Sequence, residues 1–192
     1  ALAQEIADAH GVKARYIAAD LSDSDAARAL VETAGRCDIL INNAGVQHVA
    51  PIERFPTAKW DAIIAINLSS AFHTTAAALP MMRKAGWGRI VNIASTSGTK
   101  GRKLGTAYAA SKWAVRGISQ CWQAELRPHS IRVISICPSE VQTRWGGRVG
   151  RNNPNKLYAV DIAETIMAAL NMPPRALWPE LSVFATNPWK ED

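Results

Sequence analysis

Apolar and polar positions follow two alternating patterns along most of the chain. Short apolar runs bounded by Gly, Asn or Pro predict β-strands at residues 14–20, 37–43, 88–95, 131–137 and 181–186. Between these runs, apolar residues recur every three to four positions and predict helices at residues 1–9, 22–34, 57–84, 106–127 and 161–170. We expect Pro80 to kink or split the third helix. The segment 139–157, rich in Gly, Asn and Arg, is expected to be an irregular loop.

This alternation of apolar strands with helices predicts a parallel sheet covered by helices on both faces. No internal repeat and no long linker divides the 192 residues. The sequence therefore predicts an α/β fold with one doubly wound sheet, in a single domain that covers residues 1–192.

Composition excludes several classes of protein. With 48% apolar and 20% charged residues the chain can build a core, which excludes a disordered tail and a disulfide-stapled mini-protein. The net charge of +6 is too small to indicate a nucleic-acid-binding surface by itself. Three separated cysteines and four scattered histidines predict a reducing, cytoplasmic location and no metal site. We also expect no membrane span, because no apolar run approaches the ~20 residues that one needs.

The strongest candidate chemistry lies between residues 95 and 112. Tyr108 and Lys112 are four residues apart at the start of a helix, so their side chains lie on one face. An ammonium beside a phenol favours the phenolate, which predicts a lowered pKa for Tyr108 and a role in proton transfer. Ser95 ends the preceding strand, where its hydroxyl can hydrogen-bond a reacting oxygen.

An isolated Tyr-x-x-x-Lys pair is more often a buried tyrosine beside a solvated lysine. Three further features favour the functional interpretation here. Asn42-Asn43-Ala44-Gly45 follows a second strand, and Pro138 and Thr143 follow a third, so all lie at the same edge of the sheet. Asn67 lies inside a long helix, where Asn is unfavourable unless its side chain has a specific role.

With these residues the sequence resembles the short-chain dehydrogenase/reductase family over about residues 15–145. The resemblance rests on the order and spacing of Asp20, Asn42-Asn43-Ala44-Gly45, Asn67, Ser95, Tyr108-x-x-x-Lys112, Pro138 and Val141-x-Thr143. It implies a Rossmann-like fold and a nicotinamide dinucleotide cofactor, NAD or NADP, acting on a small alcohol or ketone. One small departure is Ser139, where the family usually has Gly after the proline.

The resemblance also implies a role for each matching residue. Tyr108 would be the acid/base and Ser95 would hold the substrate oxygen. Lys112 would bind the nicotinamide ribose and tune Tyr108, and Asn67 would support a proton-relay water. The remaining cofactor contacts would come from Asp20, Leu21, Asn43, Ala44, Gly45, Pro138, Val141 and Thr143.

A narrower resemblance to bacterial D-3-hydroxybutyrate dehydrogenases covers residues 38–95. It implies that Gln47, two residues after the Asn-Asn-Ala-Gly motif, contacts a substrate carboxylate. Those enzymes have a His where this chain has Ser97 and a Lys where it has Gly105. The second half of the chain is more similar to general carbonyl or 3-oxoacyl reductases of the same family, so both substrate classes stay open. Residues 100–156 carry eleven Lys/Arg and two Asp/Glu, consistent with attraction of an anion or with a solvated loop.

The family's phosphate-binding Gly-x-x-x-Gly-x-Gly loop is absent from this sequence, which begins at Ala1. We therefore expect a fragment in which that loop and the first β-α-β unit would precede residue 1. The run 14–20 would then have no neighbouring strand, and the remaining sheet would have an unprotected edge. The alternative is a non-catalytic scaffold or oligomerisation module; in either case the resemblance implies a homo-oligomer, a dimer or tetramer.

Overall fold

The structure, a computed structural model, describes residues 2–143, 145 and 153–187. At its centre is a sheet of four parallel strands in the order β1-β2-β3-β6. The strands are β1 (Ile39–Asn42), β2 (Gly88–Ile93), β3 (Ile131–Pro138) and β6 (Glu180–Val183). Each strand therefore pairs with the next one, and their carboxyl ends lie at one edge of the sheet. This confirms the predicted parallel α/β architecture.

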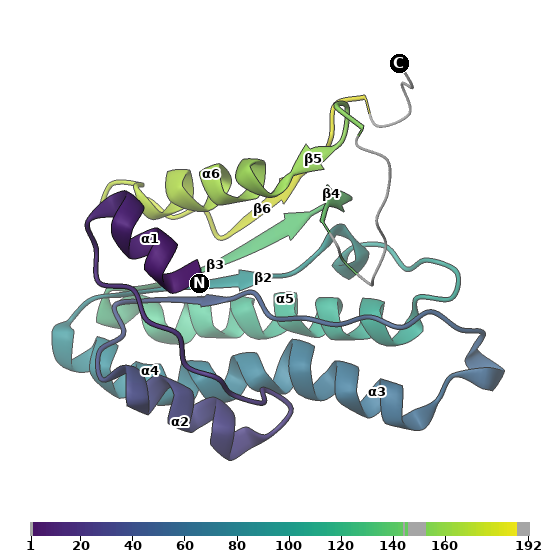
Figure 1. Ribbon diagram of the computed structural model, residues 1–192, viewed down its shortest axis with the longest axis horizontal. Helices are drawn as coiled ribbons and strands as arrows, with labels where there is room; N and C mark the ends of the chain where they lie inside the picture. The colour runs from purple at the N-terminus through teal and green to yellow at the C-terminus, as the bar shows by residue number, and fades with distance from the viewer. Residues whose placement is uncertain (1, 144, 146–152, 188–192) are drawn as a thin grey trace.

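Helices cover both faces of this sheet. The helices are α1 (Leu2–His10), α2 (Ser24–Ala34), α3 (Thr57–Ile64), α4 (Ser70–Ala85), α5 (Thr106–Leu126) and α6 (Ala159–Leu170). Figure 1 shows α2 to α5 on one side of the sheet and α6 on the other. Short 3₁₀ segments lie at Ile52–Arg54, Thr96–Gly98 and Arg127–His129.

The strands separate two apolar clusters because successive side chains point to opposite faces. Ile90 and Val133 pack with Met82 of α4 on one face. Val91 and Ile134 pack on the other face, where the partners include Ala169 of α6. These two apolar clusters, one on each face of the sheet, fix the positions of the strands and therefore of their carboxyl ends. On β1 this cover is incomplete, since Ile39 and Ile41 are each 45% exposed.

The predicted strand at 14–20 is wrong. Residues 12–20 form no strand and make no ladder with β1, so β1 is an edge strand within the described residues. The physical reason is the one the sequence indicates: an apolar run becomes a strand only when a partner satisfies its backbone groups.

The interruption in the helix at 57–84 also differs from the prediction. Helix α4 continues through Pro80 to Ala85, and the break falls earlier, in a π-helical turn, η2 (Ala65–Ser69), that surrounds Asn67. Such a turn holds one extra residue and often lies at a functional site. The two described ends of the segment expected to be an irregular loop also form a short ladder, in which β4 (Val141–Gln142) pairs with β5 (Leu157–Tyr158).

The helical run Thr57–Ala85 is long and apolar enough to cross a membrane, with a mean hydropathy of 1.4. The sequence analysis expected no such stretch. One side of this run nevertheless faces the protein and buries polar groups there. Asn67, Ser70 and Thr74 are buried and each hydrogen-bonds another group of the chain. That side of the run therefore belongs to the core of this fold.

A polar ladder crosses the core between β1, β2 and the helices. Asn42 and Asn92 are partners in the register, and Asn42 Nδ2 donates to the side-chain oxygen Oδ1 of Asn92 at 2.8 Å. Asn92 in turn donates to Ser119 of α5 at 2.8 Å, and Thr74 of α4 donates to Asn42 at 2.8 Å. Each of these hydrogen bonds joins a strand to its neighbouring strand or to a helix. Together they fix the positions of β1 and β2 relative to each other and to α4 and α5.

Asn92→Ala should lower the free energy of unfolding by about 2–4 kcal/mol, because it removes the hydrogen bond from Asn42 and the one to Ser119 inside the core. Urea denaturation followed by circular dichroism measures this change. Asn171→Ala, at an exposed helix end, is the matched control and should change stability by less than ~0.5 kcal/mol. Equal effects of the two variants would contradict a structural role for the ladder.

Candidate active site

Ser95, Tyr108 and Lys112 come together at the carboxyl edge of the sheet. Ser95 follows β2, while Tyr108 and Lys112 lie one turn apart in α5. The Lys112 ammonium nitrogen lies 5.7 Å from the Tyr108 ring centroid, and the Ser95 side chain is near enough to the Tyr108 hydroxyl to lower its pKa. The predicted cluster is therefore present as a set of contacts.

Lys112 is a buried cation that forms no ion pair with a carboxylate of the described residues. Its side chain is 3% exposed, and its Nζ donates to the Ile93 carbonyl at the end of β2, 2.6 Å away. Burial lowers the pKa of Lys112 from its ordinary 10.5 to about 8. One of its three N–H groups is used in this bond, so the ammonium can still donate to oxygen atoms of a ligand.

The expected lowering of the Tyr108 pKa is not what the structure shows. Burial raises the pKa of Tyr108, while the hydrogen bond with Ser95 and the charge of Arg102 lower it to a smaller extent. Lys112 lies beside the ring and is bound to Ile93, so its charge does not offset the loss of solvent around the hydroxyl. Tyr108 therefore holds its proton at neutral pH and is suited to donate it.

Asn67 ties the loop after β1 to the helices. Its Oδ1 accepts from the Val46 N–H at 2.8 Å, and its Nδ2 donates to the Val46 carbonyl at 2.9 Å and to Ser111 at 3.0 Å. Both amide hydrogens are used, so a proton-relay water at this position could bind the Asn67 side chain only by donating to Oδ1. The π-helical turn directs this side chain inward, which explains an Asn inside a helix.

A cavity of about 230 Å³ lies beside this cluster, between α2, α4 and β1. Leu21, Asn43, Ala44 and Asn67 line it, so four of the predicted site residues meet here. Asp20 precedes the cavity in an exposed turn, where the backbone N–H and the hydroxyl of Ser22 both donate to its carboxylate. These bonds lower the pKa of Asp20.

Gly45 connects the cavity to the catalytic cluster. A Cβ at this position would lie 3.5 Å from Asn67 Oδ1, 3.8 Å from Lys112 Nζ and 3.2 Å from the Trp145 ring. The backbone therefore passes close to the buried ammonium, and a side chain at position 45 would crowd that space.

Trp145 is the site residue that the sequence analysis missed. Its ring lies edge-on to Tyr108, with centroids 6.1 Å apart, and its backbone N–H donates to Thr143 Oγ1 at 3.3 Å. Thr143 thus reaches the cluster through Trp145, whereas Pro138 ends β3 and Val141 pairs with β5. The available signal was a bulky aromatic residue two positions after Thr143 in a loop rich in Gly and Arg.

The segment before α5 places a cation near Tyr108. Arg102 is exposed, belongs to none of the four ion pairs among the described residues, and its charge acts on the Tyr108 hydroxyl. A turn closes from the Gly105 N–H to the Arg102 carbonyl at 3.1 Å. A Cβ at Gly105 would lie 3.9 Å from the Arg102 Cβ, so the two positions face the same space. Gln47 is half-buried and follows Val46, which Asn67 holds.

The residues present fit the ribose and nicotinamide part of a dinucleotide. The buried Lys112 ammonium has N–H groups left to donate and no carboxylate partner in the described part of the chain, which suits neutral hydroxyl ligands. The close backbone approach at Gly45 and the polar Asn43 lie beside it. Lys112, Tyr108, Asn43, Ala44 and Gly45 are therefore the groups that would hold that part of the cofactor.

Comparison with known proteins identifies the family. A family model described as short chain dehydrogenase matches residues 1–154. The chain belongs to the short-chain dehydrogenase family, whose members are NAD(P)-dependent oxidoreductases.

Two relatives and one solved structure show the extent of the similarity. The D-beta-hydroxybutyrate dehydrogenase of Cupriavidus necator is 46% identical over 144 residues, 72% of this chain and 56% of that protein. The protein of the same name from Rhizobium meliloti is 50% identical over 109 residues, 57% of this chain and 42% of that protein. A metagenomic short-chain oxidoreductase in complex with NADP is 34% identical, with a TM-score of 0.82, over 95% of this chain and 78% of that one. The chain thus spans about half the length of the two relatives.

Lys112 should make stability depend on pH between 8 and 10.5. In this window the unfolded lysine is protonated while the buried one is neutral, so unfolding takes up a proton and the free energy of unfolding rises with pH, by at most about 3 kcal/mol. Lys112→Met should remove this rise. Urea denaturation of both proteins at pH 7.5, 9 and 10 checks it, and Lys84→Met at an exposed position is the control. Identical pH profiles for Lys112→Met and the unchanged protein would contradict the burial of the ammonium.

Proposed function

We propose that this protein interconverts a secondary alcohol and a ketone with a nicotinamide dinucleotide as the redox partner. The observation that carries the proposal is the contact set of Ser95, Tyr108 and Lys112 at the carboxyl edge of a parallel sheet. The family and the NADP-bound structural neighbour support it. The choice between NAD and NADP is left to titration with each.

The chain's own residues supply the proton chemistry. When bound, the nicotinamide exchanges a hydride with the substrate carbon. In the direction of reduction, Tyr108 gives its hydroxyl proton to the carbonyl oxygen as the carbon gains the hydride, and in oxidation it takes the proton back. Ser95 donates a hydrogen bond to the same oxygen and stabilises its charge. Because burial raises the pKa of Tyr108, reduction is favoured at neutral pH and oxidation at alkaline pH.

We further propose an anionic substrate of the 3-hydroxy acid class, such as 3-hydroxybutyrate. Support comes from the two hydroxybutyrate dehydrogenase relatives and from Arg102 near Tyr108, which is in no ion pair with the described residues. Arg102 faces the space of position 105, so its guanidinium can bind a carboxylate while the substrate oxygen meets Ser95. Gln47 is the second candidate for the carboxylate. A general carbonyl reductase acting on neutral ketones is the alternative, favoured by Ser97 and Gly105.

Tyr108→Phe should reduce turnover by about 10³-fold or more while leaving dinucleotide binding within about twofold, because the proton donor is lost and the ring is kept. Initial rates with D-3-hydroxybutyrate and with 2-butanol, each with NAD and NADP, measure turnover. Fluorescence titration with NADH and NADPH measures binding. Tyr16→Phe, an exposed tyrosine, is the matched control. Retained turnover in Tyr108→Phe would remove the proposed mechanism.

Arg102→Gln should raise the KM for D-3-hydroxybutyrate about tenfold, the effect of losing one charge-assisted hydrogen bond, and leave the KM for 2-butanol unchanged. Lys103→Gln removes an equal charge from the adjacent residue and serves as control. A KM for 2-butanol that rises as much as that for the acid would support the general carbonyl reductase instead.

A further inference from the structure

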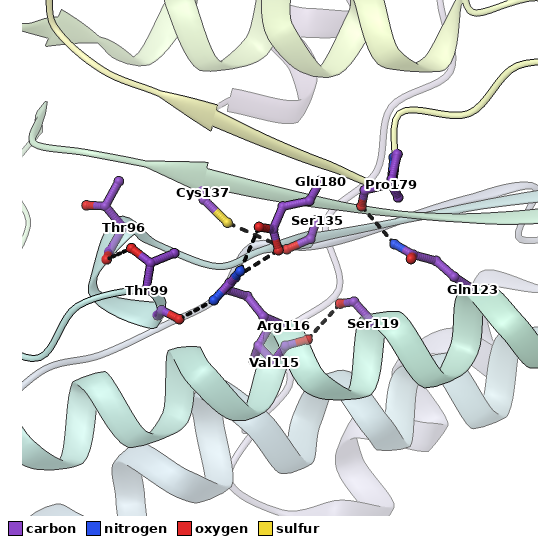
Figure 2. A network of polar contacts seen from close by, with 11 residues as sticks. Thr96, Thr99, Val115, Arg116, Ser119, Gln123, Ser135, Cys137, Pro179 and Glu180 are labelled. Atoms are coloured by element: carbon purple, nitrogen blue, oxygen red, sulfur yellow. Dashed lines mark hydrogen bonds and ion pairs between the residues drawn. The ribbon is translucent and has the colours of Figure 1, made fainter.

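Arg116 lies one turn after Lys112 in α5 and belongs to a partly buried network behind Ser95. Its Nε donates to one carboxylate oxygen of Glu180 at 2.8 Å, and its Nη2 donates to the other at 2.7 Å. The side chains of Arg116 and Glu180 are 17% and 28% exposed. Figure 2 shows this pair bridging α5 and the start of β6. The guanidinium is thus held in one orientation by a two-pronged contact.

The third face of the guanidinium holds the turn that follows Ser95. Arg116 Nη1 donates to the Gly98 carbonyl at 2.5 Å, at the end of the 3₁₀ segment η3 (Thr96–Gly98). Gly98 lies directly on α5, because a Cβ there would be 2.7 Å from the Lys112 carbonyl oxygen and 2.9 Å from Arg116 Cδ. Arg116 therefore fastens the serine turn to the helix that carries Tyr108 and Lys112.

The hydrogen bonds inside this turn fix its conformation but do not fix its position relative to α5. Ser97 N–H donates to Ser95 Oγ at 3.1 Å, and Gly98 N–H donates to the Ser95 carbonyl at 2.8 Å. Among the described residues, Arg116 donates a side-chain hydrogen bond that joins Gly98, at the end of this turn, to α5. On the other side, the Ala94 N–H donates to the Ile136 carbonyl of β3 at 2.8 Å. Ser95 is thus placed between β3 and the guanidinium.

A purely stabilising role does not account for this choice of residues. Partly buried ion pairs contribute little to stability compared with apolar residues of the same size. Three donors aimed at three fixed oxygens require the planar fork of arginine, which the single ammonium of lysine does not reproduce. The hydrogen bonds to Glu180 raise the pKa of Arg116, so the fork stays charged at every relevant pH.

We propose that the Arg116–Glu180 pair is a positioning element that sets where the Ser95 hydroxyl stands relative to Tyr108. The pair acts through the Gly98 carbonyl and touches neither substrate nor cofactor. This inference rests on the proposed function of Ser95 and Tyr108.

Hydrogen–deuterium exchange tests the positioning role without any ligand. In Arg116→Lys the amides of residues 96–99 should exchange about tenfold faster or more, because the turn is released from α5. Peptides from 131–137 should keep their protection, which separates local release from general destabilisation. Arg132→Lys is the matched control, since Arg132 also donates to two carbonyls, those of Met172 and Pro173, but at the other end of β3. Glu180→Gln should act as Arg116→Lys does, to a smaller extent, and gives a second variant if one folds poorly.

Kinetics gives the second readout. With D-3-hydroxybutyrate and the dinucleotide that supports turnover, Arg116→Lys should lower kcat about 10- to 100-fold, because Ser95 is misplaced by a fraction of its hydrogen-bond length. The KM for the dinucleotide should change by less than about twofold. Unchanged exchange at 96–99 in both Arg116→Lys and Glu180→Gln would overturn the positioning role. Turnover that survives Tyr108→Phe would overturn the proposed function instead, so the two failures are distinguishable.

Discussion

The hydrogen bond from the Lys112 ammonium to the Ile93 carbonyl is the contact on which the rest of the site depends. It joins α5 to the carboxyl end of β2 at a fixed register. Tyr108 lies one turn before Lys112 and Arg116 one turn after it, so both are placed by the same anchor. Ser111, the neighbour of Lys112, accepts from Asn67 and brings the loop after β1 to the same point. One buried donor thus orders three separate segments.

Two cationic side chains near this point, Lys112 and Arg116, differ in how far the protein satisfies their hydrogen bonds. Lys112 is buried with no carboxylate partner where the structure describes the chain, and the cost of that burial appears as its lowered pKa. Arg116 is satisfied on all three sides and keeps its charge. The unpaired group is the one that faces the space for a ligand, whereas the paired group faces the scaffold. This difference between Lys112 and Arg116 is typical of sites in which a bound ligand, and not the folded chain, provides the remaining hydrogen-bond partners.

Much of the fold could be predicted from periodicity, and the site from a few side chains. The strands after which Asn43, Ser95 and Pro138 lie were found because a buried parallel strand is a short apolar run with sharp ends. The run at 14–20 carries the same signal, but a strand also needs a partner, and no local pattern supplies one. The roles of Tyr108 and Lys112 followed from their spacing. The sign of the Tyr108 pKa shift did not, because burial depends on residues far apart in the sequence.

Contacts between segments far apart in the chain could not be predicted from the sequence, for the same reason. Arg116 and Glu180 are 64 positions apart, and neither residue type in isolation indicates an ion pair behind a serine. Trp145 packs on Tyr108 and Gly45 through a loop with no periodic pattern. Such residues are recognised only when the sheet has brought its carboxyl ends together.

The π-helical turn η2 gives the helix from Thr57 to Ala85 an additional property. The turn holds one residue more than α-helical geometry needs, and each residue corresponds to a rotation of about 100° around the axis. The faces of α3 and α4 are therefore set independently, although the two helices are continuous. A one-residue length change within Ala65–Ser69 acts as a rotation of everything that follows, not as a loop adjustment. The number of residues in this turn therefore sets the rotation of α4 about its axis relative to α3.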